Sequence, residues 1–201
     1  MEVQHSAPHF QLTVARDALV LFTTVLQSGI ELKSNAGIPM GRFLSELPGF
    51  TADYIGDVVQ TIFLNGTAID DLTTPLEGHN PTLALSAAMP GLAGAIFRKN
   101  SFHSALRTDT KKTSSIDKQQ KALTVTLKLF NSIAQERGIE LLKRGVCIKT
   151  KPVLLFFKKR GLLLQKISKI EVKQKAVDTA TFLSLLSQSE KINIRIVKSH
   201  G

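Results

Sequence analysis

A polar stretch without hydrophobic periodicity, residues 98–120, divides this sequence and sets the strongest limit on its fold. It reads RKNSFHSALRTDTKKTSSIDKQQ and is rich in Ser, Thr and Lys. Such a composition is typical of a linker, because it offers no apolar face to bury. We therefore predict two domains, residues 1–97 and 121–201, joined by a linker over residues 98–120. The chain has 201 residues, of which 43% are hydrophobic, and this is enough for two small cores.

Charge is distributed unequally between the two halves. Residues 1–107 carry six Lys and Arg against nine Asp and Glu, whereas residues 108–201 carry twenty against seven. The halves therefore have net charges of −3 and +13, within a total of +10. This asymmetry is typical of a chain with a basic partner-binding module, although a Lys-rich, solvated surface has the same signature.

Short periodic segments in the first half predict a mixture of small helices and strands. The expected helices cover residues 40–47 and 51–59, and the expected strands cover residues 29–32, 60–64, 67–69 and 82–87. Thr51 is a suitable N-cap for the second helix, and Asn65-Gly66 is a turn signal between two strands. Residues 17–27 are apolar almost throughout, so periodicity leaves helix and strand both open there.

In the second half, alternation of Leu123, Val125, Leu127 and Leu129 with polar residues predicts a strand with one buried face. A helix over 132–145 follows. Apolar runs at 153–157 and 162–165, joined by residues 158–161, predict a hairpin with a basic tip. A helix after Asp178 and a strand over 192–196 complete a β-α-β-β-α-β order, the ferredoxin-like arrangement. A pleckstrin-like curved sheet is the alternative, since the middle of this half could be all strand.

Residues 62–95 carry a resemblance to a known family. Phe63-Leu64-Asn65-Gly66 forms a strand and turn, Pro75-Leu76-Glu77-Gly78-His79 a second turn, and Leu83-Ala84-Leu85 a strand before Pro90-Gly91. In this order they resemble the last third of the small sulfur-carrier proteins of molybdopterin and thiazole synthesis. The resemblance implies a ubiquitin-like β-grasp fold for residues 1–97. Such carriers react through a free terminal Gly-Gly, whereas Gly94 is followed here by Ala95, so carrier chemistry would require cleavage after Gly94.

Motifs of catalysis and of metal or phosphate binding are absent from the sequence. The five histidines and Cys147 lack metal-ligand spacing, and there is no GxSxG, GxxxxGK[ST] or GxGxxG motif. The paired carboxylates, Asp70-Asp71 and Asp53/Asp57, are expected on exposed surfaces. We therefore expect no cofactor and no metal, and favour a protein that is not an enzyme. A single cysteine, no signal peptide and no apolar run long enough to cross a bilayer predict a cytoplasmic location.

The strongest functional signal is a basic cluster over residues 143–175, which holds eleven Lys and Arg and one acidic residue. The candidate anion-binding or partner-binding residues are Lys143, Arg144, Lys149, Lys151, Lys158, Lys159 and Arg160. Lys outnumbers Arg by nine to two, which favours diffuse attraction over bidentate recognition. The absence of Trp and of an RNP signature argues against sequence-specific binding of single-stranded nucleic acid. A second candidate docking element is a partner loop formed by Met89, Pro90, Gly91 and Leu92.

These patterns lead to one functional hypothesis and two alternatives. The hypothesis is a non-catalytic binding or assembly module, with an acidic protein partner or self-association, such as a homodimer, favoured over nucleic acid. The first alternative is an accessory or carrier-like protein of sulfur or molybdopterin cofactor metabolism. The second is nonspecific nucleic-acid binding through the Lys-rich face.

Overall fold

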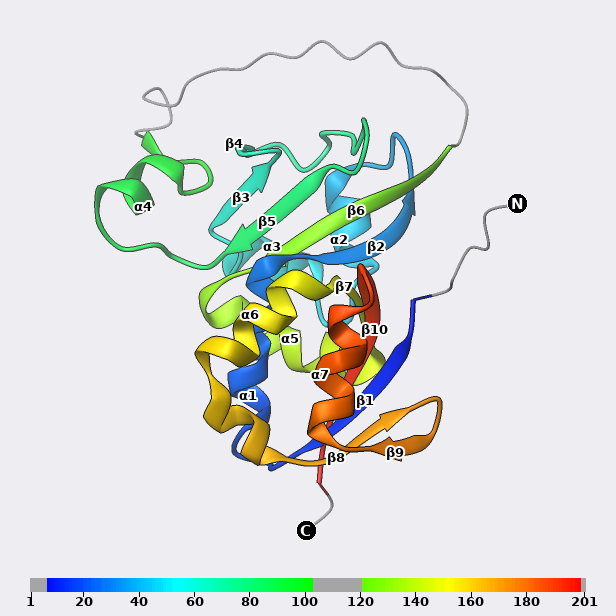
Figure 1. The fold of residues 1–201 in the computed structure, drawn as a ribbon. Helices are drawn as coiled ribbons and strands as arrows, with labels where there is room; N and C mark the ends of the chain where they lie inside the picture. The colour runs from blue at the N-terminus through cyan, green and yellow to red at the C-terminus, as the bar shows by residue number, and fades with distance from the viewer. Residues whose placement is uncertain (1–6, 103–120, 200–201) are drawn as a thin grey trace. The chain divides into compact units, whose positions relative to one another are not determined.

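A computed structural model describes residues 7–102 and 121–199 (Figure 1). The described residues form a mixture of helices and strands, which confirms the expected α+β class. The chain divides into two compact units: Met1–Ile30 with Gly138–Gly201, called here the terminal unit, and Glu31–Arg137, called the inserted unit. These bounds differ from the expected domains, because the division falls inside one strand and one helix. Of the expected linker, residues 103–120 lie outside the described residues.

The inserted unit is built around a five-stranded part of the sheet. Its elements are β2 (Ile30–Asn35), α2 (Met40–Ser45), α3 (Ala52–Asp57), β3 (Thr61–Leu64), β4 (Thr67–Ala68), β5 (Thr82–Ser86), α4 (Gly91–Phe97), β6 (Ala122–Leu129) and the beginning of α5 (Asn131–Arg144). The strand order is β4-β3-β5-β6-β2. β3 pairs antiparallel with both β4 and β5, while β5 and β6 run parallel, with Leu83 opposite Leu127.

The core of the inserted unit follows the alternation of β6. Leu123, Val125, Leu127 and Leu129 are all buried, as the sequence predicts. Helix α2 adds Met40, Phe43 and Leu44 to the buried set at helical spacing. Thr51 caps α3 by accepting a hydrogen bond from the backbone N–H of Tyr54, which confirms the predicted N-cap.

A polar cluster joins α3 to the first turns of α5. The Tyr54 hydroxyl donates a hydrogen bond of 2.9 Å to Glu136, and the guanidinium of Arg137 lies 3.9 Å from the centre of the Tyr54 ring. Gly49, with a φ of +79°, lies against the Arg137 side chain. Burial and the neighbouring Glu136 carboxylate raise the pKa of Tyr54 to about 12. The cluster therefore holds a neutral phenol between a carboxylate and a cation.

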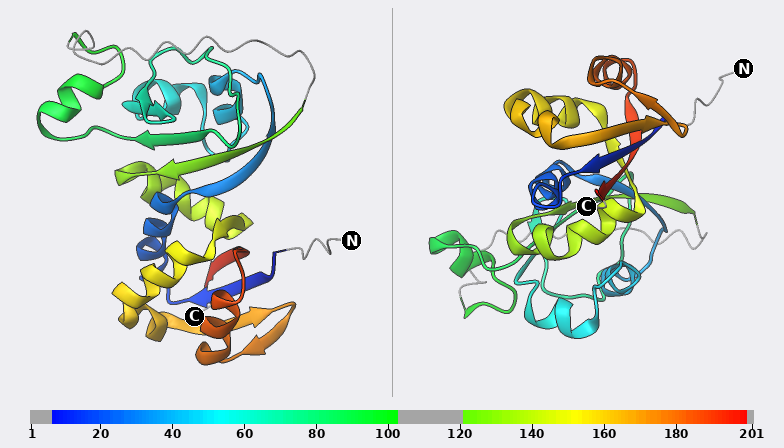
Figure 2. Two further views of the ribbon diagram at one scale, coloured as in Figure 1. Left: turned by 45° about the horizontal axis from the view of Figure 1, so that its top comes forward. Right: turned by 90° about the horizontal axis from the view of Figure 1, so that it is seen from below.

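The terminal unit combines the first strand of the chain with its last elements. They are β1 (His9–Val14), α1 (Leu19–Phe22), η1 (Thr23–Ser28), the end of α5, β7 (Val146–Lys149), α6 (Thr150–Lys159), η3 (Gly161–Lys166), β8 (Ile167–Val172), β9 (Lys175–Val177), α7 (Thr179–Ser187) and β10 (Lys191–Lys198). The strand order is β7-β10-β1-β8-β9. Figure 2 shows β1, in blue, beside β10, in red, and the two run parallel with His9 opposite Asn193.

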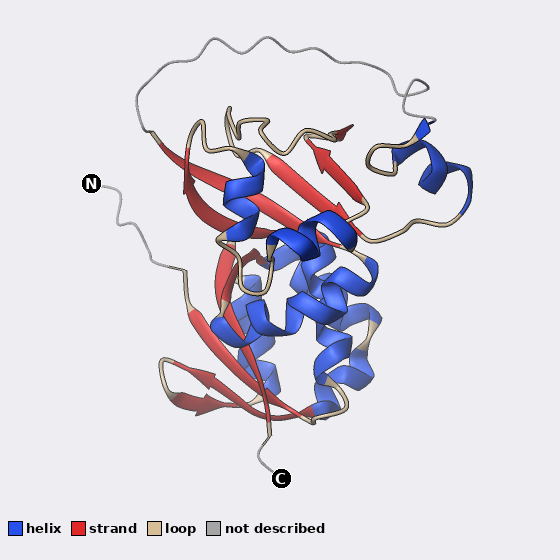
Figure 3. Cartoon of the chain, turned by 180° about the vertical axis from the view of Figure 1, so that it is seen from behind, coloured by secondary structure: helices blue, strands red, loops and turns tan. Residues whose placement is uncertain are grey.

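Aromatic side chains connect this sheet to its helices, which Figure 3 shows in blue beside the red strands. Phe10 of β1 meets Phe182 of α7 with ring centres 5.2 Å apart, and Phe182 meets Phe157 of α6 at 5.7 Å. Phe157 in turn lies 6.2 Å from Phe22 of α1. The helices therefore share one apolar face of the sheet, where Phe182 is completely buried. Within residues 17–27, left open by the sequence, the structure is helical from Leu19 onward: α1 buries Leu19 and Phe22, and η1 buries Val25 and Leu26.

The predicted hairpin over residues 153–165 is wrong. Residues 150–159 form α6, and residues 161–166 form the 3-10 helix η3. Val153 and Phe157 are buried four residues apart, which is helical spacing. Pro152 fits in this helix because the first turn has backbone N–H groups without intrahelical acceptors.

The expected β-α-β-β-α-β order over residues 121–201 is also different in the structure. β6 pairs with β5 in the inserted unit, while β10 and β8 both pair with β1, which comes from the other end of the sequence. The order of segments within residues 121–201 could not predict these pairings, because β1 and β5 lie outside that range. The final hairpin of the segment is formed by β8 and β9, whose turn has Lys173 and Gln174 at positive φ.

Candidate functional site

Three of the seven basic residues predicted to bind a partner lie on α6. The core side of this helix carries Thr150, Val153 and Phe157. Its exposed side carries Lys151, Leu155, Lys158 and Lys159, which together are called here the basic helix face. Among the described residues, no carboxylate lies at ion-pair distance from these three lysines. Their charge is therefore not neutralised locally and can act on a partner.

Exposed leucines accompany the lysines. Leu155, in the middle of the basic helix face, is 50% exposed, and Leu162 in η3 is 76% exposed. Leu21 of α1 is also largely exposed. Single exposed leucines are normal on protein surfaces, but here two of them, Leu155 and Leu162, are interspersed with cations over about three helical turns. The surface can therefore offer apolar contact and positive charge to the same partner.

Arg160 has a different role from the one predicted for it. It is the C-cap residue of α6 and not the tip of a hairpin. Its Nη1 donates a hydrogen bond of 2.6 Å to the Thr24 hydroxyl of η1, and its guanidinium lies 5.4 Å from the centre of the Phe156 ring. Arg160 therefore fixes the end of α6 against η1, and its orientation is set by the fold.

The remaining predicted basic residues lie outside the basic helix face. Lys143 and Arg144 end α5, where both contact Glu140 at 3.8 and 3.7 Å. Lys149 ends β7, opposite Lys191 of β10 in the strand register. The structure thus brings together three of the seven predicted residues on one surface and accounts for two others by local ion pairs.

The predicted partner loop is only partly a loop. Pro90 is the N-cap of α4, and Gly91 and Leu92 form its first turn, so the expected apolar loop ends at Pro90. Leu92 is 72% exposed. A Cβ atom at Gly94 would overlap the backbone carbonyl of Met89. Gly94 is therefore required for the close approach of α4 to the segment before it, a packing role that the sequence did not suggest.

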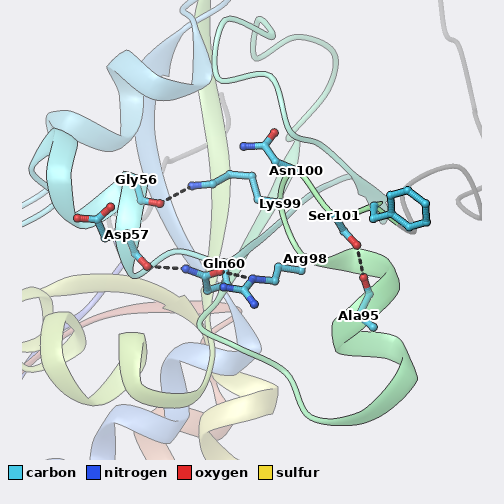
Figure 4. A pocket seen from close by; sticks show the side chains of 9 residues that line it. Gly56, Asp57, Gln60, Ala95, Arg98, Lys99, Asn100 and Ser101 are labelled. Carbon is cyan, nitrogen blue, oxygen red and sulfur yellow. Dashed lines mark hydrogen bonds between the residues drawn. The ribbon is translucent and has the colours of Figure 1, made fainter.

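A cavity of about 640 Å³ lies in the inserted unit, beside the C-terminal end of α3 (Figure 4). We call it the lysine cavity; its lining residues are Gly56, Asp57, Gln60, Ala95, Arg98, Lys99, Asn100, Ser101 and Phe102. Lys99 Nζ donates to the carbonyl oxygens of Ile55 at 2.7 Å and Gly56 at 3.1 Å. Burial lowers the pKa of Lys99, against the attraction of the more distant Asp57 and Asp70. Sequence analysis missed this group, because Arg98 to Ser101 lie in the stretch interpreted as a linker.

Gln60 connects the two walls of the lysine cavity. Its Nε2 donates to the Asp57 carbonyl at 2.5 Å, and its Oε1 accepts from Arg98 Nε at 2.7 Å. The Gln60 carbonyl accepts from the backbone N–H of Lys99 at 2.6 Å. On the far wall, the Ser101 hydroxyl donates to the Ala95 carbonyl. These bonds fix the segment after α4 against the end of α3.

The other chemical candidates have structural explanations. Asp71 accepts hydrogen bonds from the backbone N–H and hydroxyl of Thr73, which holds the pKa of that carboxyl below its usual value and forms a local turn. Asp53 is in the exposed first turn of α3. Over residues 7–102 and 121–199, no three His, Cys, Asp or Glu side chains are placed to hold a metal ion.

Comparison of the chain with protein-family models, with curated proteins and with solved structures gives no match. Among the helices of the described part of the chain, none has the length and apolarity needed to cross a bilayer.

Proposed function

We propose that this protein is a non-catalytic binding module whose terminal unit docks an acidic segment of a protein partner. The observation that carries the proposal is the basic helix face, where three lysines without ionic partners among the described residues surround the exposed Leu155. The terminal unit carries fifteen Lys and Arg against six Asp and Glu, a net charge of +9. The inserted unit, with eleven against ten, is close to neutral.

The composition of the basic helix face favours a protein partner over nucleic acid. Phosphate groups would satisfy its lysines but leave Leu155 and the neighbouring Leu162 exposed, whereas an acidic amphipathic helix can cover both kinds of side chain. The face carries no aromatic side chain on which a base could stack. Arg160, the residue suited to bidentate phosphate binding, lies outside this face, and its Nη1 donates to Thr24.

The proposal can be tested with the full chain and a labelled amphipathic helical peptide of Glu and Leu, followed by fluorescence anisotropy. Replacing the three lysines of the basic helix face with Gln should weaken binding about tenfold or more at low salt. The matched control replaces Lys173, Lys175 and Lys198 with Gln, which removes the same charge from the same unit and should have a much smaller effect. Leu155→Ser should also weaken binding, and its effect should persist at high salt.

Two results would overturn the assignment. Equal loss of affinity in the two triple variants would mean that net charge, and not this face, attracts the peptide. Tighter binding to duplex DNA or to vesicles containing anionic lipid, with the same dependence on Lys151, Lys158 and Lys159, would identify a different partner class.

A second proposal concerns the inserted unit, which we infer to be a β-grasp scaffold with its strands permuted. A β-grasp sheet has five strands in the order 2-1-5-3-4, with the two middle strands, first and last, running parallel. The order β2-β6-β5-β3-β4 and the parallel pairing of β5 with β6 support this reading if β6 takes the place of the first strand. Contacts of Ala36 with Lys121 and of Lys33 with Thr124 indicate that β2 and β6 run antiparallel, as the first two strands of that fold do.

The carrier alternative, which comes from the sequence resemblance, requires cleavage after Gly94, and that cut would separate β6 from the rest of the scaffold. Mass spectrometry of the protein from its own cells tests it directly. A fragment ending at Gly94, with or without a thiocarboxylate, would support a sulfur carrier. An intact mass would argue against the carrier alternative and leave docking through the terminal unit as the proposed function.

A further inference from the structure

The lysine cavity carries an inference independent of the docking surface on α6. We propose that this cavity binds the oxyanion group, carboxylate or phosphate, of a small polar molecule, with the Lys99 ammonium as its main electrostatic contact. Neither the basic helix face nor the β-grasp scaffold requires such a site.

The first argument is the absence of a counter-ion. Lys99 Nζ contacts only the carbonyl oxygens of Ile55 and Gly56 among the described residues, and no carboxylate lies within ion-pair distance of it there. An ammonium has three N–H donors, so one remains after these two hydrogen bonds. A half-buried cation with a remaining donor and no counter-ion is a favourable place for an anion.

The electrostatic state of Lys99 agrees with this argument. Burial is the largest influence on the group and lowers its pKa, as expected when a cation loses water without gaining a carboxylate. Asp57 and Asp70 act in the opposite direction from longer range. An oxyanion in the cavity would add the close negative charge that Lys99 lacks.

The second argument is the arrangement of polar groups around Lys99. Arg98 and Asn100 line the same cavity as Lys99, so three consecutive residues contribute a guanidinium, an ammonium and an amide (Figure 4). Ser101 also lines it, with its hydroxyl donating to the Ala95 carbonyl, and Asp57 is the one carboxylate in the lining. Asn100 has a φ of +55°, a left-handed conformation that Asn tolerates better than most residues. The hydrogen bonds of Gln60 to both walls hold these groups in place before a ligand arrives.

The volume and the polarity of the lysine cavity limit the class of ligand. A volume of about 640 Å³ is in the range that small-molecule sites occupy. The lining is mainly polar, which favours a small hydrophilic molecule over an apolar one. Apart from its chain neighbours and the backbone of α3, no heavy atom lies within 4 Å of the position that a Cβ at Gly56 would take, so this lining residue has open space for a side chain.

The open space at Gly56 allows a test of the proposal in which Lys99 is kept. The full chain, labelled with nitrogen-15, is titrated separately with inorganic phosphate and with acetate while amide signals are followed by NMR. Saturable shifts should appear at Gly56 and residues 99–101 at probe concentrations up to about 10 mM, consistent with millimolar affinity. Saturation by one probe alone would support the site and identify which oxyanion it prefers.

Two variants and one control decide the outcome. Gly56→Met adds a bulky side chain at the wall of the cavity, next to the carbonyl that Lys99 contacts, and should weaken binding about tenfold or more. Lys99→Met removes the ammonium and should weaken binding by a similar factor. Lys128→Met removes one charge from β6 of the same unit and should leave the affinity unchanged. Because Lys99→Met also removes hydrogen bonds to the end of α3, the Gly56 variant is decisive when its other signals keep their positions. Shifts that do not saturate, or that persist in the Gly56 variant, would overturn the proposal.

Discussion

The ionisation of Tyr54 offers a direct measurement of the packing between α3 and α5. Tyr54 is 6% exposed, and its hydroxyl donates to Glu136. Burial first, and then Glu136, raise its pKa to about 12 from 10.0. At pH 10 an ordinary phenol is half ionised, whereas about 1% of Tyr54 should be phenolate. The chain has one Tyr and no Trp, so phenolate absorbance during an alkaline titration reports on this residue alone.

Two substitutions should move the pKa of Tyr54 in opposite directions. Glu136→Gln removes a group that raises the pKa and should lower it, while burial keeps it above 10. Arg137→Gln removes a cation that lowers the pKa and should raise it further. Chain unfolded in urea provides the reference and should titrate near 10. A folded protein that titrates near 10, or two variants that shift in the same direction, would refute the arrangement.

The same raised pKa has a consequence for stability at high pH. The folded state favours the neutral phenol of Tyr54. The contribution of Tyr54 to the free energy of unfolding is therefore complete below pH 10 and is lost as the pH rises from about 10 to about 12. Circular dichroism during the titration separates this loss from unfolding.

Three further predictions concern individual elements. Phe182→Ala should reduce the free energy of unfolding by about 3–5 kcal/mol in urea denaturation, because it opens a cavity between β1, α6 and α7. Gly94→Ala should expose the backbone amides of α4 to hydrogen exchange, whereas Gly56→Ala, with open space at its Cβ, should not. The Asp178 carboxylate caps α7 by accepting a hydrogen bond from the backbone N–H of Thr181. Hydrogen bonding from the Thr181 side chain first, and then from its backbone N–H, lowers the pKa of this carboxyl. The stabilisation of α7 by this cap should therefore be present at neutral pH and lost as the pH falls through the lowered pKa of Asp178. Asp178→Asn should remove this pH dependence of stability in an acid titration.

Local sequence patterns were sufficient to predict secondary structure where a single periodicity dominated. The alternation in β6 and the cap at Thr51 each had a single reading, and both were confirmed. Residues 153–157 are apolar without interruption, so helix and strand periods fit equally well, and the hairpin prediction failed there. Pairing between distant strands left no local signal. The parallel contact of β1 with β10 depends on residues 184 positions apart, such as His9 and Asn193.

For the candidate sites too, part could be predicted from the sequence and part depends on the fold. Composition indicated a basic cluster over residues 143–175, because an excess of one charge is visible without a fold, but it did not separate Lys151, Lys158 and Lys159 from the other four predicted residues. Their common helix face and the engagement of Arg160 by Thr24 depend on contacts that only the fold provides. Lys99 had no distinguishing neighbours in the sequence. Its place in a cavity results from hydrogen bonds to Ile55 and Gly56, more than 40 residues earlier.

The pairing of β1 with β10 has a consequence during synthesis of the chain. A ribosome adds about 5–20 residues per second, so the 184 residues from His9 to Asn193 take roughly 10–40 s to complete. Throughout that interval Phe10 and Leu12 lack the strand beside which they are buried in the finished protein. The inserted unit is synthesised within the same interval and can form first. We therefore expect the nascent chain to expose the apolar residues of β1 and to depend on chaperones until β10 emerges.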